Sequence, residues 1–310
     1  MTKKSLRIEY GKSLVELGRR FPSLVALEAD LKDSTQSVQF QKAFPKRYIQ
    51  VGVAEQNMVG IAAGLALAGK IPVAHSFACF ISMRACEQVR TSVAFPILNV
   101  KFLAAHAGIS AGSAGTTHHA IEDIAIMRAI PNMTVLVPGD VKEMRQVLEA
   151  AIRYQGPVYI RMPAIEAEDI YGNNDNFSIG KATKLRSGND VTIITTGIMM
   201  AEGVKASDIL RRDFGIKARV LQMASIKPID RKTVIKAARE TGCIVTIEEH
   251  TILGGLGSAV CEIVAEFGGA RVKALGINDH FCGVGSASYL IRQEGLTAER
   301  ITKEIVSLLN

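Results

Sequence analysis

The sequence contains no tryptophan, and aromatic residues make up only 5% of its 310 positions. Its basic residues are dispersed along the chain, although the formal net charge is +7. Nucleic-acid-binding proteins instead gather Lys and Arg on one face and add aromatic side chains that stack on bases. We therefore expect no nucleic-acid partner. The positive charge is either an ordinary basic surface or a field that attracts phosphorylated or other anionic small substrates.

Long hydrophobic runs and paired cysteines are also missing. The longest nearly uncharged run, residues 58–69, is shorter than the roughly 20 residues that a membrane-spanning helix needs. The N-terminal residues have no signal-peptide pattern. The five cysteines form no close CxxC pair, so neither a disulfide framework nor a Cys-based metal site is expected. These features predict a cytoplasmic protein with no membrane partner and no metal ligands of its own.

Familiar nucleotide-binding loops are not found. No GxxxxGK[ST] phosphate loop occurs, and "GGLGSA" (254–259) matches the dinucleotide-binding fingerprint only loosely. We interpret these glycines as tight-turn residues at the start of a helix.

Apolar, strand-like runs alternate with helical patterns through most of the chain, which predicts parallel sheets covered on both faces. A polar stretch rich in Asn and Asp, residues 164–178, interrupts the alternation and is predicted to be a linker. We therefore predict an α/β fold with two doubly wound domains, residues 1–170 and a smaller domain at 178–310. The predicted strands are 23–30, 47–54, 71–77, 99–106, 133–139, 157–163, 190–197, 217–223, 242–249 and 271–277. The predicted helices are 55–68, 82–93, 120–129, 141–154, 201–214, 230–241, 257–267 and a last one from 297.

Three groups of side chains follow predicted strands, at the carboxyl ends where open α/β sheets bind ligands. Glu55 opens a helix inside an apolar run, where it either compensates the helix N-terminus or serves a site. Phe77 and Phe80 are either core residues or an aromatic platform for a flat ring. His106 and His118 flank a loop of small residues, which favours substrate hydrogen bonding or proton transfer over metal binding.

Three longer segments resemble one family when taken together. They are "VGVAEQNMVGIAAGLALAGKIPV", "IEDIAIMRAIPNMTVLVPGD" and "TIEEHTILGGLGSAV". Nearly the whole chain resembles the C-terminal half of transketolase, as found in split transketolases made of two subunits. The resemblance implies a thiamin-diphosphate pyrimidine-binding domain followed by a C-terminal transketolase domain.

The resemblance also implies roles for individual residues. In that family the Glu of the "AEQ" stretch hydrogen-bonds the aminopyrimidine of thiamin diphosphate and promotes the tautomer that makes the nucleophilic ylid, and Glu55 holds this position. The implied catalytic residues are Glu55, His106 and His118. The implied cofactor-binding residues are Glu55, Phe77, Phe80, Asp30 and Met83, the last in place of a third aromatic. The implied substrate-binding residues are Arg7, Ser34, His106, His118 and Arg161.

Two departures from the family pattern shape the expected function. Ala114 replaces an Asp that reads a sugar hydroxyl, which predicts an altered preference among sugar or sugar-phosphate substrates. The Gly-Asp-Gly motif that holds Mg²⁺ and diphosphate belongs to the other half, so we expect an N-terminal partner subunit in a two-plus-two heterotetramer.

Other functions remain open for such a chain. A deoxyxylulose-phosphate synthase-like subunit and the beta-type subunit of a 2-oxo acid dehydrogenase share much of the pattern. A non-catalytic regulatory subunit that kept the fold is an alternative of another class.

Overall fold

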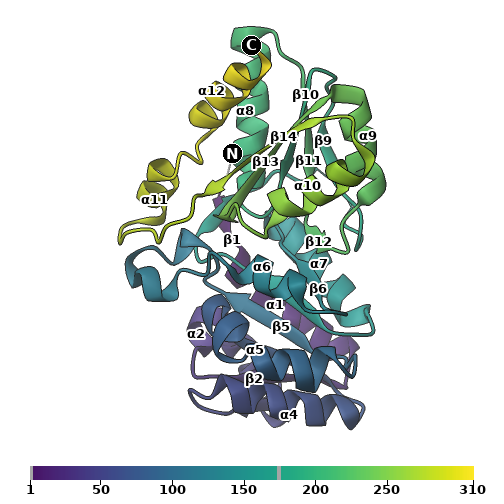
Figure 1. The fold of residues 1–310 in the computed structure, drawn as a ribbon. Helices are drawn as coiled ribbons and strands as arrows, with labels where there is room; N and C mark the ends of the chain where they lie inside the picture. The colour runs from purple at the N-terminus through teal and green to yellow at the C-terminus, as the bar shows by residue number, and fades with distance from the viewer. Residues whose placement is uncertain (1–2, 173–175) are drawn as a thin grey trace.

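The computed structural model describes residues 3–172 and 176–310. A seven-stranded sheet forms the core of the N-terminal half (Figure 1). Its strand order is β12-β6-β7-β5-β4-β2-β3, and all pairings are parallel except that of β12 with β6. The strands are β2 (Leu24–Glu28), β3 (Tyr48–Gln50), β4 (Ile71–Phe77), β5 (Lys101–Ala105), β6 (Thr134–Leu136), β7 (Val158–Arg161) and β12 (Ser225–Lys227). All residues of β2, β5 and β7 are buried, as expected for strands covered on both faces.

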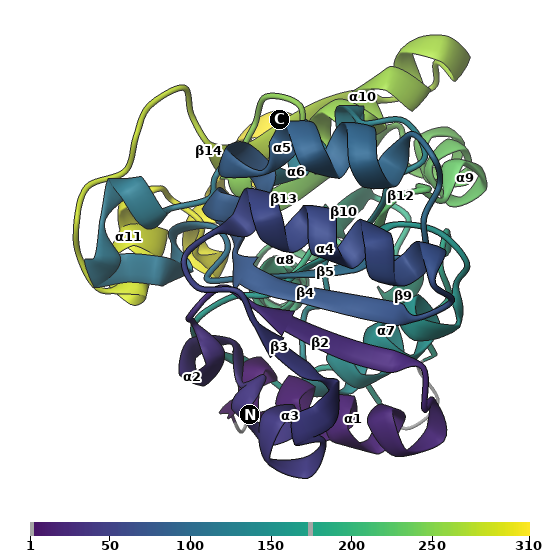
Figure 2. The same cartoon turned by 90° about the horizontal axis from the view of Figure 1, so that it is seen from below.

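Helices lie on both faces of this sheet (Figure 2). One face carries α4 (Glu55–Leu67), α5 (Cys86–Gln88) and α6 (Asp123–Ala129). The other carries α1 (Leu6–Arg20), α3 (Val38–Ala43) and α7 (Val141–Arg153), with α2 (Lys32–Thr35) following β2. Because β2, β3, β4 and β5 pair in parallel, their carboxyl ends lie at one edge of the sheet, where the connecting loops begin.

A five-stranded sheet forms the core of the C-terminal half, with the order β14-β13-β10-β11-β9 and an antiparallel β9 at its edge. Helices α8 and α12 lie on one side of it, and α9 and α10 on the other (Figure 1). The strands are β9 (Thr183–Arg186), β10 (Val191–Thr195), β11 (Ala218–Gln222), β13 (Cys243–Thr251) and β14 (Arg271–Ile277). The helices are α8 (Met199–Phe214), α9 (Arg231–Thr241), α10 (Leu256–Phe267), α11 (Ala287–Gln293) and α12 (Ala298–Leu309).

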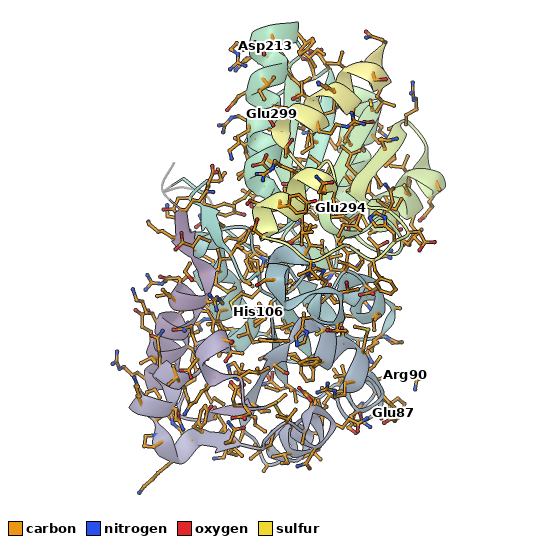
Figure 3. All side chains as sticks on the ribbon, turned by 90° about the vertical axis from the view of Figure 1, so that its left-hand side faces the viewer. Glu87, Arg90, His106, Asp213, Glu294 and Glu299 are labelled. Carbon is orange, nitrogen blue, oxygen red and sulfur yellow. The ribbon has the colours of Figure 1, made fainter. Side chains whose placement is uncertain are left out.

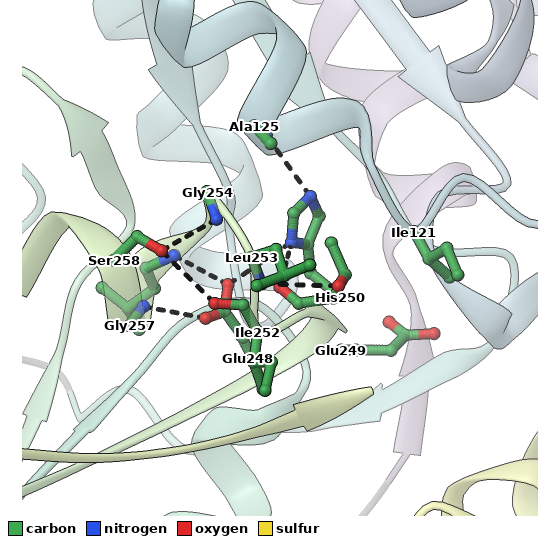
Figure 4. Close-up of polar contacts among 12 residues, drawn as sticks. Ile121, Ala125, Glu248, Glu249, His250, Ile252, Leu253, Gly254, Gly257 and Ser258 are labelled. Atoms are coloured by element: carbon green, nitrogen blue, oxygen red, sulfur yellow. Dashed lines mark hydrogen bonds and ion pairs between the residues drawn. The ribbon is translucent and has the colours of Figure 1, made fainter. Parts of the chain in front are cut away.

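The glycines of residues 254–259 start α10, as the sequence predicted. The Glu248 carboxylate accepts hydrogen bonds from the N–H groups of Leu256 (2.7 Å) and Gly257 (2.8 Å), as Figure 4 shows in part. A Cβ atom at Gly255 would lie only 2.0 Å from Glu248 Oε2, so the approach requires glycine. Burial raises the pKa of Glu248 to about 7.

Two short pairings cross between distant parts of the chain. β12 comes from the C-terminal half yet pairs with β6 of the first sheet. β1 (Lys3–Ser5) pairs with β8 (Glu166–Glu168), which lies inside the predicted linker. Within the same segment Tyr171 is buried, and its hydroxyl donates to Glu143 and contacts Thr183.

The structure confirms the predicted α/β class and corrects it in three places. Each main sheet is mixed, because an edge strand joins it antiparallel. Residues 164–178 are not a plain linker, because β8 and Tyr171 are anchored there, while residues 173–175 lie outside the described part of the chain. The helix predicted at 82–93 is instead a π-helical turn at Phe80–Arg84, then α5, then a second π-helical turn at Val89–Ala94.

Candidate functional site

Four rings meet at the carboxyl ends of β4 and β5. The ring centres of Phe77 and Phe80 are 5.8 Å apart in a stacked arrangement, and that of His106 lies 4.2 Å from Phe77. His118 meets Phe80 edge-on at 5.5 Å and Phe77 at 6.1 Å. The structure therefore brings two histidines against a pair of phenylalanines that lies well before them in the sequence.

The pairing of β4 with β5 explains why these rings meet. Phe77 is the last residue of β4 and lies opposite Ala105, so His106 follows directly beside it. His106 has a left-handed backbone with φ 54°, which ends β5 and starts the loop of small residues. That loop runs through short 3₁₀ turns and returns His118 to the same place.

Glu55 lies at the start of α4 and is 1% exposed. Its Oε1 accepts a hydrogen bond from Ser76 Oγ (2.9 Å), and its Oε2 pairs with Arg84 Nη1 (2.7 Å). The helix N-terminus also favours a negative charge there. These partners hold the buried Glu55 carboxylate in one orientation. One of them, Ser76, directly precedes Phe77.

A basic and polar group adjoins the histidines. Arg7 Nη1 donates to the Ser34 carbonyl at 3.3 Å, so the structure brings these two predicted residues together. Burial first, and then the nearby charges of Arg7 and His118, lower the pKa of His106 to about 4. Neutral His106 can therefore donate from one ring nitrogen and accept at the other at neutral pH.

Asp30 lies at the turn that precedes Glu55, and Met83 directly precedes Arg84. Asp30 follows β2 with φ 65°, and its N–H donates to Gln50 Oε1 at 3.0 Å. The same oxygen accepts from the Gly52 N–H, which fixes the turn that leads to Glu55. Met83 lies on the π-helical turn and is 46% exposed.

Two family models match the chain. The transketolase pyrimidine binding domain matches residues 3–168, and the transketolase C-terminal domain matches residues 180–301. The chain belongs to the transketolase family.

Individual relatives agree with that assignment. This transketolase chain is 48% identical over 306 residues to a "Putative transketolase C-terminal section" from Methanocaldococcus jannaschii, covering 98% of this chain and 96% of that one. It is 44% identical over 298 residues to a 6-deoxy-6-sulfo-D-fructose transketolase subunit from a Clostridium species, covering 96% and 92%. A solved structure described as "Split gene transketolase, inactive beta4 tetramer" superposes with a TM-score of 0.91 at 45% identity, covering 98% of each chain.

The structure places Arg161 between the two halves of the chain, and its predicted role in phosphate binding stays a prediction. Its side chain is 4% exposed, and its Nε bonds both carboxylate oxygens of Asp123 (3.1 and 3.0 Å). Its Nη2 donates to the carbonyls of Ala120 (3.2 Å) and Glu249 (2.9 Å). Its Nη1 makes only a 4.0 Å approach to Glu249 Oε2, so Arg161 joins the two halves of the chain and keeps one nitrogen without a close acceptor among the described residues.

Several residues that the sequence did not single out support the site. Glu28 accepts hydrogen bonds from Thr35 Oγ1 (2.9 Å) and the Leu31 N–H (3.1 Å), which holds the segment that carries Ser34. Burial raises the pKa of Glu28 to about 7. A charged residue inside an otherwise apolar strand was the available signal for Glu28. Nothing comparable marked Ser76 or Arg84.

Glu249 points to the opposite side of β13 from Glu248 (Figure 4). It is 2% exposed, and its Oε2 lies 4.0 Å from Arg161 Nη1. A Cβ atom at Gly108 would lie 2.5 Å from its carboxyl carbon. The loop between His106 and His118, here called the histidine loop, therefore lies directly against a carboxyl group from the C-terminal half.

A second cluster of donor atoms lies elsewhere, where His280, Cys282 and Glu294 converge. His280 Nε2 is 3.1 Å from Glu294 Oε1, and burial together with Glu294 raises the pKa of the Cys282 thiol to about 12. The structure thus shows these three groups as a hydrogen-bonded set centred on Glu294. None of the helices within residues 3–172 and 176–310 combines the length and the apolar character that a bilayer span requires.

Proposed function

We propose that this chain is the C-terminal subunit of a two-component, thiamin-diphosphate-dependent transketolase. It moves a two-carbon ketol unit from a ketose to an aldose. The observation that carries the proposal is the convergence of Glu55, Phe77, Phe80, His106 and His118 at one sheet edge. In this proposal residues 1–170 form the pyrimidine-binding domain and residues 178–310 the C-terminal domain.

The residues present fit the aminopyrimidine end of thiamin diphosphate. The stacked faces of Phe77 and Phe80 suit a flat heterocycle, and Glu55 supplies a buried acceptor for a ring N–H. His106 Nδ1 is buried and has no hydrogen-bond partner within residues 3–172 and 176–310, so it is available to a ligand. When bound, the cofactor supplies the nucleophilic carbon and stabilises the carbanion.

The chain's own residues would bind and orient the sugar. Glu55 holds the shared proton at its carboxylate, while His106 and His118 hydrogen-bond substrate oxygens from the facing loop. Arg7 has a buried Nε that no described residue bonds, and with the neighbouring Ser34 it would hold a phosphate or other anionic end of the sugar. Met83 and Asp30 belong to the edge of the cofactor site in this proposal.

A partner subunit completes the enzyme. The sequence contains no Gly-Asp-Gly motif, so the diphosphate and Mg²⁺ would be held by an N-terminal subunit. The relatives described as a C-terminal section and a subunit support this division of labour. Apolar side chains around α4 are open to solvent, with Val53 71%, Leu67 75% and Phe95 81% exposed. Such a surface suits burial against a partner. We infer a two-plus-two heterotetramer in the cytoplasm.

The sugar preference should differ from that of ordinary transketolase. Ala114 lies exposed on the histidine loop and offers no acceptor for a sugar hydroxyl. A relative at 44% identity is described as acting on a sulfonated sugar, which supports an anionic, non-standard substrate. The measurement is kcat/KM of the assembled enzyme across ketose donors. Full transketolase efficiency on xylulose 5-phosphate would contradict the prediction.

The deciding experiment replaces Glu55 by Gln in the enzyme assembled with its N-terminal partner, thiamin diphosphate and Mg²⁺. We expect kcat to fall by about 10²-fold or more, because the amide cannot hold the shared proton. Glu87→Gln is the matched control, since Glu87 is exposed and projects outward (Figure 3). The chain without its partner should be inactive. Unchanged activity of Glu55→Gln would favour a regulatory role, and ketol transfer by the chain alone would refute the two-subunit proposal.

A further inference from the structure

Arg84 makes two contacts at once in the candidate site. Its Nη1 pairs with Glu55 Oε2 at 2.7 Å, and its guanidinium carbon lies 4.2 Å from the centre of the Phe80 ring. The Arg84 carbonyl is held separately, because Gln56 Nε2 donates to it at 3.1 Å. The backbone is thus anchored, and the side chain reaches over the ring to the carboxylate.

These contacts are the ones that a bound aminopyrimidine would need. A guanidinium is planar, it stacks on aromatic faces, and it donates N–H groups in its own plane to a carboxylate. A flat nitrogen heterocycle stacks on the same rings and donates to the same carboxylate. Glu55 Oε1 is already bonded to Ser76, so Oε2 is the oxygen that both would compete for.

We propose that Arg84 is a built-in cap of the cofactor site, which occupies Glu55 and Phe80 until the cofactor displaces it. The inference rests on the proposed function, because it takes the heterocycle of thiamin diphosphate as the displacing ligand. The cap keeps the buried carboxylate paired when no cofactor is bound.

The two ends of the ion pair differ in a way that suits a reversible cap. The Glu55 side chain is fully buried, whereas that of Arg84 is 45% exposed. A buried carboxylate left without a partner is costly, so Glu55 needs a donor at all times. A half-exposed guanidinium regains water when it leaves, so breaking its side of the pair costs little. Arg84 therefore leaves readily, provided that another donor replaces it.

The cap predicts the direction in which the affinity for thiamin diphosphate changes when the Arg84 side chain is removed. Thiamin diphosphate with Mg²⁺ is titrated by calorimetry into the assembled enzyme carrying Arg84→Ala. We expect the cofactor to bind about fivefold to tenfold tighter, because a competitor that reduces the binding-competent fraction has been removed. Arg90→Ala, in the same segment and projecting outward (Figure 3), is the control and should leave the affinity unchanged. Unchanged or weaker binding by Arg84→Ala would overturn the cap and make Arg84 a structural residue or a ligand.

A chemical competition gives a second readout, in which each protein is measured with and without an added guanidinium compound. In Arg84→Ala, added methylguanidinium should refill the vacated place and weaken cofactor binding, whereas it should not affect wild type. Arg84→Lys covers the case in which the alanine variant fails to fold, and its cofactor affinity should lie above that of wild type, because the ammonium stacks less well. If the alanine variant folds, absence of the methylguanidinium effect would also overturn the proposal; if it does not fold, absence of the gain in affinity in Arg84→Lys would overturn it. If wild type itself binds no thiamin diphosphate, the proposed function fails; if it binds and these effects are absent, only the cap fails.

Discussion

At the scale of single residues, His106 shows how position determines chemistry. Its left-handed backbone, φ 54°, is uncommon for a residue other than glycine, and such conformations cluster at functional sites. Its ring packs on Phe77, and Arg7 lies on its polar side. The pKa of about 4 follows from burial first and from the neighbouring positive charges second.

We expect His106 to stay neutral throughout the physiological pH range. A histidine ring-proton titration by NMR, assigned through His106→Asn, should place its midpoint near 4. Arg7→Gln should move the midpoint upward, because it removes one of the charges that disfavour the imidazolium. Arg153→Gln, on the exposed side of α7, should not move it. A wild-type midpoint near the ordinary 6.5 would contradict the described environment.

At the scale of elements, a buried chain of hydrogen bonds joins α1, β4 and β2 beneath the site. The Tyr10 hydroxyl is 2.6 Å from His75 Nε2, and His75 Nδ1 is 2.8 Å from the Leu27 carbonyl. Since the carbonyl can only accept, the proton of neutral His75 lies on Nδ1 and the tyrosine donates to Nε2. These hydrogen bonds fix the position of β4 relative to α1 and β2, and Phe77 is the last residue of β4.

His75 should make the fold sensitive to acid. Burial lowers its pKa to about 4, so below pH 6.5 the unfolded chain takes up a proton that the folded chain refuses. The stability that neutral His75 contributes is thus complete above pH 6.5 and is lost as the pH falls toward 4. Urea unfolding should show the difference in unfolding free energy between wild type and His75→Gln narrowing by up to about 3 kcal/mol from pH 7 to pH 4. An equal difference at both pH values would contradict this assignment.

At the scale of the whole molecule, Arg161 joins the two halves. It extends from the end of β7 to Asp123 at the start of α6 and to the Glu249 carbonyl in β13. Tyr159 also donates to Asp123 at 2.9 Å, so the carboxylate is fully engaged. The pair lies beside the histidine loop, and the relative placement of the two halves therefore bears on the site.

Arg161→Met should destabilise the chain by roughly 3–5 kcal/mol, because it leaves Asp123 and Glu249 as buried acids without their cation. Arg186→Met is the matched control. Its pair with Asp208, at 3.5 Å, lies on the surface with side chains 41% and 56% exposed, and its loss should cost less than about 1 kcal/mol. Chemical unfolding followed by circular dichroism measures both. Equal effects of the two substitutions would contradict the joining role of Arg161.

Most strands and helices could be predicted because period and apolarity are local properties. Local sequence patterns also predicted that Glu55, Phe77 and His106 lie at the ends of strands. The carboxyl ends of parallel strands lie on one edge of the sheet. Arg84 could not be predicted in this way, because its aim at Glu55 depends on a π-helical turn where a regular helix was expected. The partners of Arg161 could not be predicted either, because they come from α6 and from the other half of the chain.

By itself the sequence determined the α/β alternation, the family resemblance and the set of side chains that could carry chemistry. These depend on residue type and spacing, which every stretch of chain displays without its neighbours. Only the tertiary structure decided which charges meet. Ion pairs such as Glu55 with Arg84 and Arg161 with Asp123 depend on distances between separate elements, and burial then sets how strongly each charge needs its partner.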